Sequence, residues 1–412
     1  MALLSPFTIF VQESYNMASR KVYLFAPEND MALASGKRYY TPPPVARKIA
    51  DDLSLLPLWY ACDASLVLSQ HTPPYDLQQT IDSLGITAQA ISHLPPGEWE
   101  GCPWGWSDYI CQRLEKAGIE KHLLPDEQQI AQIRQLSGRA TTREILQRFA
   151  SLKPSFPMPP LPEVLYDAAG IEHFVKSHRA TLLKAPWSSS GRGILRADNL
   201  YGNSTARQAE GILRKQGYIM GEVFLDKVAD LAFEFHSDGS HTRFVGYSLF
   251  HTDRHGCYTG NILAPDRAIE KYLSQYIPLA TLYDARHTLE EVTAGLIAPH
   301  YKGYFGIDAI IYRHTDTTLR LHPCIELNLR TNMGIVANHI TRSFVAEGSS
   351  GSYHVAYAPS PQQHLQRHSI MQEKHPPVID KGHIVKGYLP LTPLLDNTAY
   401  QAYIIIEEKN FL

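Results

Sequence analysis

Cysteine is scarce in this sequence and follows no metal-binding pattern. The 412 residues include five cysteines, an odd number, and no Cys-x-x-Cys pair occurs among them. Zinc sites and disulfide frameworks need closely spaced or evenly matched cysteines, so this usage argues against both. Scattered thiols fit a reducing compartment, and we expect a cytoplasmic protein.

Long apolar runs and an excess of charge are also missing. No run approaches the roughly 18–20 apolar residues that span a bilayer, and the formal net charge is −3. The sequence therefore favours neither a membrane nor nucleic acid as a partner. The N-terminus lacks the basic segment of a signal peptide. We expect residues 1–19 to be disordered or to precede the native start, with Met17 as the alternative to Met1.

Residues 303–334 carry the clearest structural pattern. Apolar and polar residues alternate along two stretches, which predicts two half-buried strands. The apolar face of the first contains Phe305, Ile307, Ala309 and Ile311, and that of the second contains Pro323, Ile325, Leu327 and Leu329. The polar run 314–318 between them is expected to form the turn of a hairpin.

The opposite face of this hairpin brings oxygen ligands together. Asp308, Glu326 and Asn328 project from one surface, where two carboxylates repel each other unless a cation lies between them. Hard oxygen ligands suit Mg²⁺, with Mn²⁺ as the alternative ion. Arg330 continues the alternation and offers a permanent cation to an anion at the rim. A solvated sheet face with ordinary surface charges is the competing interpretation.

A second informative stretch ends the strand expected at 180–184. Lys184 closes this strand, and a Ser/Gly-rich loop from Ser188 to Gly193 precedes the next one. Small residues let backbone N–H groups approach an anion, as phosphate loops do. The order differs from a Walker loop, because the lysine precedes the glycines and no helix follows at once. Taken alone, a flexible hairpin tip explains the stretch equally well.

Acidic residues recur beyond this loop. A strand at 218–225 carries Glu222, and Asp226, Asp230 and Glu234 follow it. In the N-terminal part, residues 29–30 (Asn-Asp) come directly after the first strand, where open α/β sheets place ligands. A structural role as a helix cap suits this pair at least as well.

The order of these segments resembles the ATP-grasp superfamily of ADP-forming carboxylate–amine ligases. The resemblance covers residues 130–345. It implies an α/β fold in which a Rossmann-like domain at 20–128 precedes an ATP-grasp module with antiparallel sheets. The module would consist of an N-terminal subdomain at 129–217 and a C-terminal subdomain at 218–412 with extra C-terminal strands.

The resemblance also implies which residues bind the nucleotide. Lys184, and Arg139 in place of the usual lysine, would contact the ATP phosphates. The loop over them would consist of Ser188, Ser189, Ser190, Gly191, Arg192 and Gly193. The backbone of Glu222 and Val223 would read adenine. No second lysine is evident beside this hinge, which departs from the family pattern.

Further roles follow from the same resemblance. Asp230 would hold the ribose, with Asp226 as the less favoured alternative. The Mg²⁺ ligands would be Asp308, Glu326 and Asn328. Arg330 would meet the reacting anion, so the implied catalytic residues are Lys184 and Arg330.

The substrate side of the site is less defined. Residues 248–261 lie where such enzymes carry a mobile segment over the substrate, which makes Arg254, Tyr258 and Asn261 substrate candidates. A solvated loop is the alternative. His322 and Cys324 share the acidic face by spacing, although a core position suits Cys324 better.

The implied activity is ATP- and Mg²⁺-dependent. The γ-phosphoryl group would pass to a small-molecule or peptide carboxylate, and an amine would displace phosphate from the acylphosphate. A phosphotransferase and a nucleotide-binding protein without turnover are the alternatives.

The C-terminal part exceeds a minimal ATP-grasp module. We expect a flexible loop at 348–352, an irregular surface segment at 358–376, and strands near 383–389 and 400–407. These strands would either add a hairpin to the sheet or form the contact of a homodimer.

Overall fold

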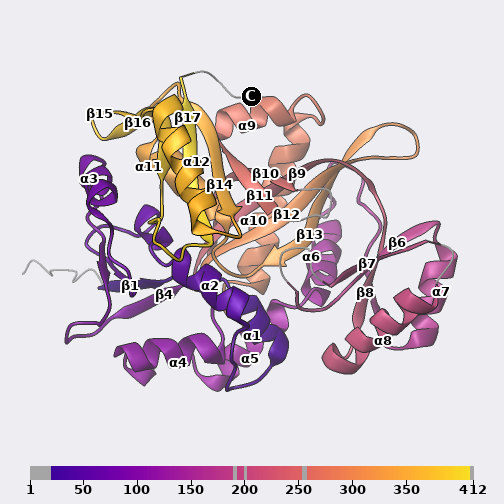
Figure 1. Ribbon diagram of the computed structural model, residues 1–412. Coiled ribbons are helices and arrows are strands. Elements are labelled where there is room, and N and C mark those ends of the chain that lie inside the picture. The colour runs from indigo at the N-terminus through magenta and orange to yellow at the C-terminus, as the bar shows by residue number, and fades with distance from the viewer. Residues whose placement is uncertain (1–19, 189–192, 199–201, 253–257, 409–412) are drawn as a thin grey trace, which may run out of the picture.

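The computed structural model describes residues 20–188, 193–198, 202–252 and 258–408. The expectations for residues 1–19, for Ser189, Ser190, Gly191 and Arg192, and for Arg254 lie outside the described residues. Within the described part, the strands form one parallel sheet and two antiparallel sheets (Figure 1). The predicted α/β class, with a parallel sheet followed by antiparallel ones, is confirmed.

The N-terminal sheet is parallel and has the strand order β3-β2-β1-β4. Its strands are β1 (Lys21–Leu24), β2 (Leu66–Leu68), β3 (Gln89–Ile91) and β4 (Glu100–Pro103). The helices that connect them are α1 (Asn29–Ser35), α2 (Pro44–Asp52), the 3₁₀ helix η1 (Leu56–Trp59) and α3 (Tyr75–Ser83), and α4 (Asp108–Ala117) follows β4. Parallel neighbours need such crossovers, because a tight hairpin joins only antiparallel strands.

A small antiparallel sheet has the order β5-β8-β6-β7. It contains β5 (Glu163–Leu165), β6 (Ala180–Lys184), β7 (Ile194–Asp198) and β8 (Ile219–Val223). The helices α7 (Ala168–Ser177) and α8 (Asn203–Gln216) bury their apolar sides against this sheet, at the right of Figure 1. Strand β8 lies within residues 218–412, the range expected for the C-terminal subdomain. It nevertheless pairs with β5 and β6 of this small sheet.

The largest sheet is antiparallel throughout, with the order β13-β12-β9-β10-β11-β14-β17-β16-β15. Its first half contains β9 (Asp226–Asp238), β10 (Thr242–Thr252), β11 (Tyr258–Leu263), β12 (Lys302–Arg313) and β13 (Leu319–Asn328). Its second half contains β14 (Ser350–Tyr357), β15 (Val378–Asp380), β16 (His383–Pro390) and β17 (Tyr400–Glu407). The hairpin predicted around 314–318 is therefore confirmed.

Helices cover both faces of this sheet. On one face, α10 (Leu279–Leu296) and α6 (Ala140–Ser151) share an apolar core with β9 and β12, together with α5 (Glu127–Leu136) and α9 (Asp266–Leu273). On the other face, α11 (Met333–Phe344) lies across β10 and β11. In the described parts of the chain, no helix combines the length and the apolar character needed to cross a membrane.

The C-terminal part corrects two expectations. Ser350–Ser352 belongs to β14 instead of a flexible loop, and residues 361–374 form the helix α12 instead of an irregular segment. The helix α12 has low hydropathy, so its sequence shows no apolar periodicity that would predict a helix. Pro361 at its start is nevertheless a typical first helical residue. The two predicted C-terminal strands are β16 and β17, and both extend the large sheet of the same chain.

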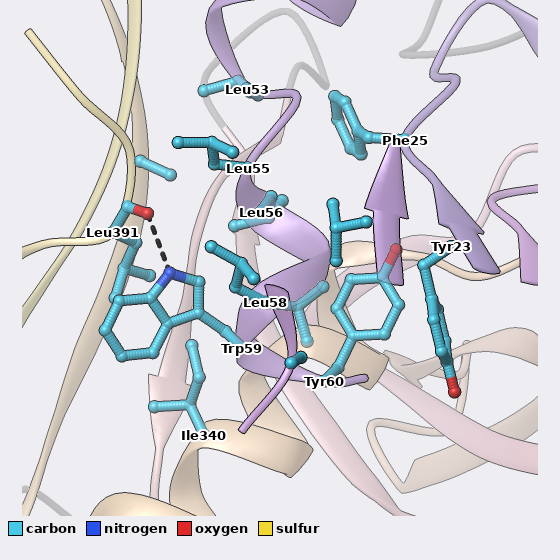
Figure 2. Packing of buried hydrophobic residues seen from close by; sticks show 14 of the residues in the cluster. Tyr23, Phe25, Leu53, Leu55, Leu56, Leu58, Trp59, Tyr60, Ile340 and Leu391 are labelled. Carbon is cyan, nitrogen blue, oxygen red and sulfur yellow. Dashed lines mark hydrogen bonds between the residues drawn. The ribbon is translucent and has the colours of Figure 1, made fainter. Parts of the chain in front are cut away.

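The N-terminal sheet and the C-terminal strands share one apolar core (Figure 2). The indole of Trp59 lies between Ile340 of α11 and the backbone of Leu391. Its Nε1 donates a hydrogen bond of 2.8 Å to the Leu391 carbonyl, and its ring meets Phe344 edge-on. The N-terminal region is therefore packed against the chain's last strands and does not have a separate core.

Candidate active site

The hairpin β12–β13 places two carboxylates directly opposite each other. Asp308 pairs in register with Glu326, and Gly306 pairs with Asn328. On the other side of β12, Asp308 is opposite Ala232 of β9. The three predicted metal ligands thus meet on one sheet face, as the alternation of the sequence predicted.

A bulge in β13 changes the faces of two residues. The register shifts after Asp308, opposite the segment that contains Pro323. Proline has no backbone N–H for the ladder, so it occurs on edge strands and at bulges. As a result Cys324 is buried in the apolar core and Ile325 lines the site, the reverse of the predicted alternation. His322 keeps its predicted face.

The surroundings of Asp308 disfavour its charged form. Burial, and then the charge of Glu326, raise the pKa of Asp308, while a hydrogen bond from the Asn328 side chain partly opposes this. Glu326 is partly neutralised by Arg139, whose Nη2 lies 2.7 Å from Glu326 Oε1. A cation between the two carboxylates would relieve their repulsion.

Arg139 comes from the segment before α6 and is 5% exposed. Its Nη2 also donates to Ser188 Oγ at 3.2 Å, which links it to the start of the Ser/Gly-rich loop. Among the described residues, its Nε and Nη1 have no hydrogen-bond partner. Buried N–H donors without acceptors are costly, so this guanidinium is well suited to an anion.

Arg330 is anchored across the interface with the N-terminal sheet. Its Nε lies 2.8 Å from Asp30 Oδ2, and its Nη2 donates to Asn328 Oδ1 at 3.0 Å. Burial opposes its charge, but Asp30, Glu326 and Asp308 outweigh that effect and raise the pKa of Arg330 above its ordinary value. Each Nη still carries a second N–H for an anion. Asp30, a weak candidate from the sequence, is therefore the residue that orients Arg330.

Lys184 and Glu222 form an ion pair of 2.5 Å between β6 and β8. Lys184 is 6% exposed, and burial together with its charge lowers the pKa of His322 to about 3, so this imidazole is neutral. The side chains of Leu182, Ile194 and Phe224 add apolar walls around this end of the site.

Asp230 and Lys227 occupy the adjoining edge of β9. Lys227 Nζ lies 2.5 Å from Asp230 Oδ2, and the Thr252 hydroxyl donates to the same oxygen at 3.3 Å. Lys227 is thus a second lysine beside the hinge strand. The sequence reading passed over it because it follows the hinge by several residues. Asp226, the alternative to Asp230, is the exposed first residue of β9 and pairs with Arg313.

These groups line a single cavity of about 940 Å³. The small sheet, the face of the large sheet and the N-terminal region all contribute to its walls. Among the predicted residues, the cavity brings together Lys184, Glu222, Val223, Asp230, Tyr258, Asn261, Asp308, Glu326, Asn328 and Arg330. Arg139 and Ser188 connect to it through Glu326.

The two described substrate candidates lie deep in this cavity instead of on a solvated loop. Tyr258 and Asn261 hydrogen-bond each other through their side chains. Asn261 also donates to Ser248 Oγ at 2.5 Å and is 1% exposed. They form a fixed polar wall rather than a mobile cover.

A buried carboxylate that the sequence reading did not single out completes the wall. Glu234 of β9 is 1% exposed and accepts a hydrogen bond of 2.8 Å from Asn332 Nδ2. Gly306 and Gly334 make room for it, because a Cβ at either position would lie within 2.4 Å of a Glu234 oxygen. The signal was available, since Glu234 alternates in step with Asp230 between the apolar Leu231, Phe233 and Phe235.

The protonation of Glu234 yields a testable dependence on pH. Burial, with a smaller contribution from Asp308, raises the pKa of Glu234 from 4.5 to about 8, against opposing effects of Asn332 and Arg330. The folded state therefore holds a proton that the unfolded state loses above pH 4.5. This contribution to stability is complete below the unfolded pKa and falls by up to about 1.4 kcal/mol per pH unit as pH rises toward 8.

Glu234→Gln should remove that dependence, because the amide imitates the protonated acid. We expect its unfolding free energy relative to wild type to increase steadily from pH 5 to pH 8, measured by denaturant unfolding at each pH. Glu115→Gln, an exposed change on α4, is the control and should follow wild type. A constant offset between Glu234→Gln and wild type would contradict a buried, protonated Glu234.

The donor set fits Mg²⁺ better than a transition metal. In the described chain, no three His, Cys, Asp or Glu side chains are grouped as a metal site. Two carboxylates and one amide oxygen leave half of an octahedral shell to water and phosphate oxygens, and Mg²⁺ sites usually keep such positions.

Several solved structures are similar to the folded chain. One similar structure is a biotin carboxylase from Campylobacter jejuni in an ATP-analogue complex, with 12% identity over 94% of this chain and 88% of that chain, at a TM-score of 0.49. Another is the N5-carboxyaminoimidazole ribonucleotide synthetase of Thermus thermophilus, with 12% identity over 94% of each chain, at 0.47. A third is the Staphylococcus aureus synthetase complexed with ADP, with 10% identity over 81% of this chain and 91% of that chain, at 0.46.

No family model matches the chain, and no curated protein matches it. The identities are 12% or lower and the TM-scores are below 0.5. These likenesses therefore carry neither a substrate nor a site residue over to this protein.

Proposed function

We propose that this protein is an ATP- and Mg²⁺-dependent ligase that activates a carboxylate as an acylphosphate for attack by an amine. One observation carries the proposal. Asp308 and Glu326 face each other in the wall of a large cavity, and cations from three distant segments surround them: the buried Arg139 and Lys184, and the partly buried Arg330. Such a site suits phosphoryl transfer, in which catalysis consists mainly of positioning and charge stabilisation.

The nucleotide is proposed to lie between the small sheet and β9. The backbone of Glu222 and Val223 would read adenine against the apolar walls, and Asp230 would bind the ribose. Arg139 and Lys184 would hold the phosphates beside Ser188. Lys227 would supply the second lysine that the sequence reading did not find.

The reaction requires two displacements. A carboxylate oxygen attacks the γ-phosphorus and ADP leaves; the amine nitrogen then attacks the acyl carbon and phosphate leaves with the C–O bond electrons. Mg²⁺, when held by Asp308, Glu326 and Asn328, screens the phosphate charge. Arg330, fixed by Asp30, is placed to orient the carboxylate and to stabilise the acylphosphate oxygens. No nucleophilic side chain is needed.

Thermal stability with nucleotide tests the site. A ligand bound only by the folded state stabilises it by about 2.7 kcal/mol at a hundred times its Kd. We expect MgADP and MgATP to raise the melting temperature of wild type, with a smaller shift when EDTA replaces Mg²⁺. Glu326→Gln should lose most of the Mg²⁺-dependent part.

The matched control is Glu144→Gln, which breaks an exposed Arg–Glu pair of 2.6 Å on α6. It should leave the nucleotide shift unchanged. The absence of any shift in wild type would overturn the proposed nucleotide site. A shift followed by a stable phosphorylated product without phosphate release, in the presence of amines, would instead favour a phosphotransferase. A homodimer stays a proposal that sedimentation can test.

A further inference from the structure

The cavity continues beyond its charged centre into an apolar compartment. Its walls come from α2 and the segment after it (Val45, Ile49 and Leu53) and from the second half of the large sheet (Val355, Tyr357 and Tyr400). In the strand order, β11 and β10 separate β14 and β17 from β9, where the nucleotide is proposed to lie. The walls on β14 and β17 are therefore two strands removed from β9, and α2 follows α1, whose Asp30 holds Arg330.

The two walls of this compartment are fixed to each other. Asp52, at the end of α2, accepts hydrogen bonds of 2.9 and 3.0 Å from the backbone N–H groups of Ala399 and Tyr400. Its other oxygen lies 2.6 Å from Lys48 Nζ. Asp52 is 6% exposed, so this clamp is shielded from water. The compartment is preformed, which reduces the entropic cost of filling it.

The chemistry of these walls is apolar and aromatic. Tyr357 and Tyr400 are opposite each other in register, and their rings lie 5.1 Å apart. Val45 and Tyr357 are 52% and 61% exposed, although they belong to the wall of a cavity. When an apolar ligand group covers apolar surface that was in contact with water, the free energy falls, and a concave site allows more of that surface to be covered.

We infer that this compartment binds an apolar or aromatic group of the carboxylate substrate, an inference that rests on the proposed function. The carboxylate must reach the γ-phosphate at the charged centre beside Arg330. The rest of the molecule then extends away from the nucleotide, toward α2, β14 and β17. The C-terminal strands are thus a specificity element: they build half of the wall that selects the acyl group.

Three carboxylates of different polarity test this inference. 3-Phenylpropionate, hexanoate and succinate are each added at 10 mM to wild type saturated with MgADP, and the additional thermal shift is measured. We expect the first two to add to the MgADP shift and succinate to add nothing. Hydroxylamine then serves as the amine, and hydroxamate formation with ATP should follow the same order.

Two variants locate the effect. Ile49→Trp fills the compartment, and Val45→Asp places a charge in it at an exposed helix position that tolerates the change. Both should keep the MgADP shift and weaken binding of 3-phenylpropionate at least tenfold. Leu365→Asp, at an exposed position of α12 away from the cavity, is the control and should bind as wild type does.

The outcomes separate the two proposals. A larger shift with succinate, no added shift with any of the three, or unchanged binding of 3-phenylpropionate in Val45→Asp would overturn the apolar compartment while the MgADP shift persists. Loss of the MgADP shift in wild type itself would overturn the proposed function, and the inference with it.

Discussion

Lys184→Met is expected to weaken MgATP binding about 10- to 100-fold, the effect of losing hydrogen bonds to charged phosphate oxygens. Phosphate release in the complete reaction should fall further, by about 10²- to 10³-fold, because charge builds up on the transferred phosphoryl group. Lys184 is nearly buried at the end of β6, so its position is fixed by the strand. Binding is measured by calorimetry and turnover by phosphate release.

Lys176→Met is the matched control for this change. Lys176 makes an ion pair of the same 2.5 Å length with Glu172, but on the exposed side of α7. Exposed pairs contribute little to stability, and this one lies outside the cavity. Wild-type affinity for MgATP in Lys184→Met would show that the phosphates bind elsewhere.

Trp59→Ala should lower the free energy of unfolding by about 3–5 kcal/mol, the cost of removing a large core side chain. The loss includes the hydrogen bond to the Leu391 carbonyl and the packing against Ile340 (Figure 2). It also includes the edge-on contact with the Phe344 ring. Because the N-terminal sheet and the C-terminal strands share this core, one cooperative transition should shift as a whole in denaturant unfolding.

Trp59→Phe separates the ring from the hydrogen bond. It keeps most of the apolar volume and should cost less than the alanine variant. An early, separate loss of only N-terminal structure in Trp59→Ala would argue that the shared core is energetically unimportant. Protease cleavage around residue 39, where Tyr39 is exposed, can detect such a partial opening.

Period-two alternation in the sequence was sufficient to find the hairpin and the ligands Asp308, Glu326 and Asn328. It could not place Ile325 and Cys324, because one bulge at Pro323 reverses the faces of both. Alternation describes a regular ladder, and proline within the strand is the local sign that the ladder is interrupted.

Contacts between residues far apart in the sequence could not be predicted either. Asp30 and Arg330 are 300 residues apart, and local pattern cannot say that a helix start in the N-terminal region orients an arginine after β13. Glu234 was overlooked for a related reason: a single acid in an apolar strand has meaning only once Gly306 and Gly334 are seen to leave space for it. The helix α12 was missed because its residues are polar on most sides.

The shared core also has a consequence for synthesis of the chain. Trp59 and its acceptor Leu391 are 332 residues apart, so at about 5–20 residues per second the ribosome needs about 15–70 s to supply the second after the first. During this interval the Nε1 of the Trp59 indole lacks its final acceptor. Nascent chains should therefore rely on chaperones that shield η1. Chains stalled before β17 should be recovered with the apolar surface of η1 still accessible.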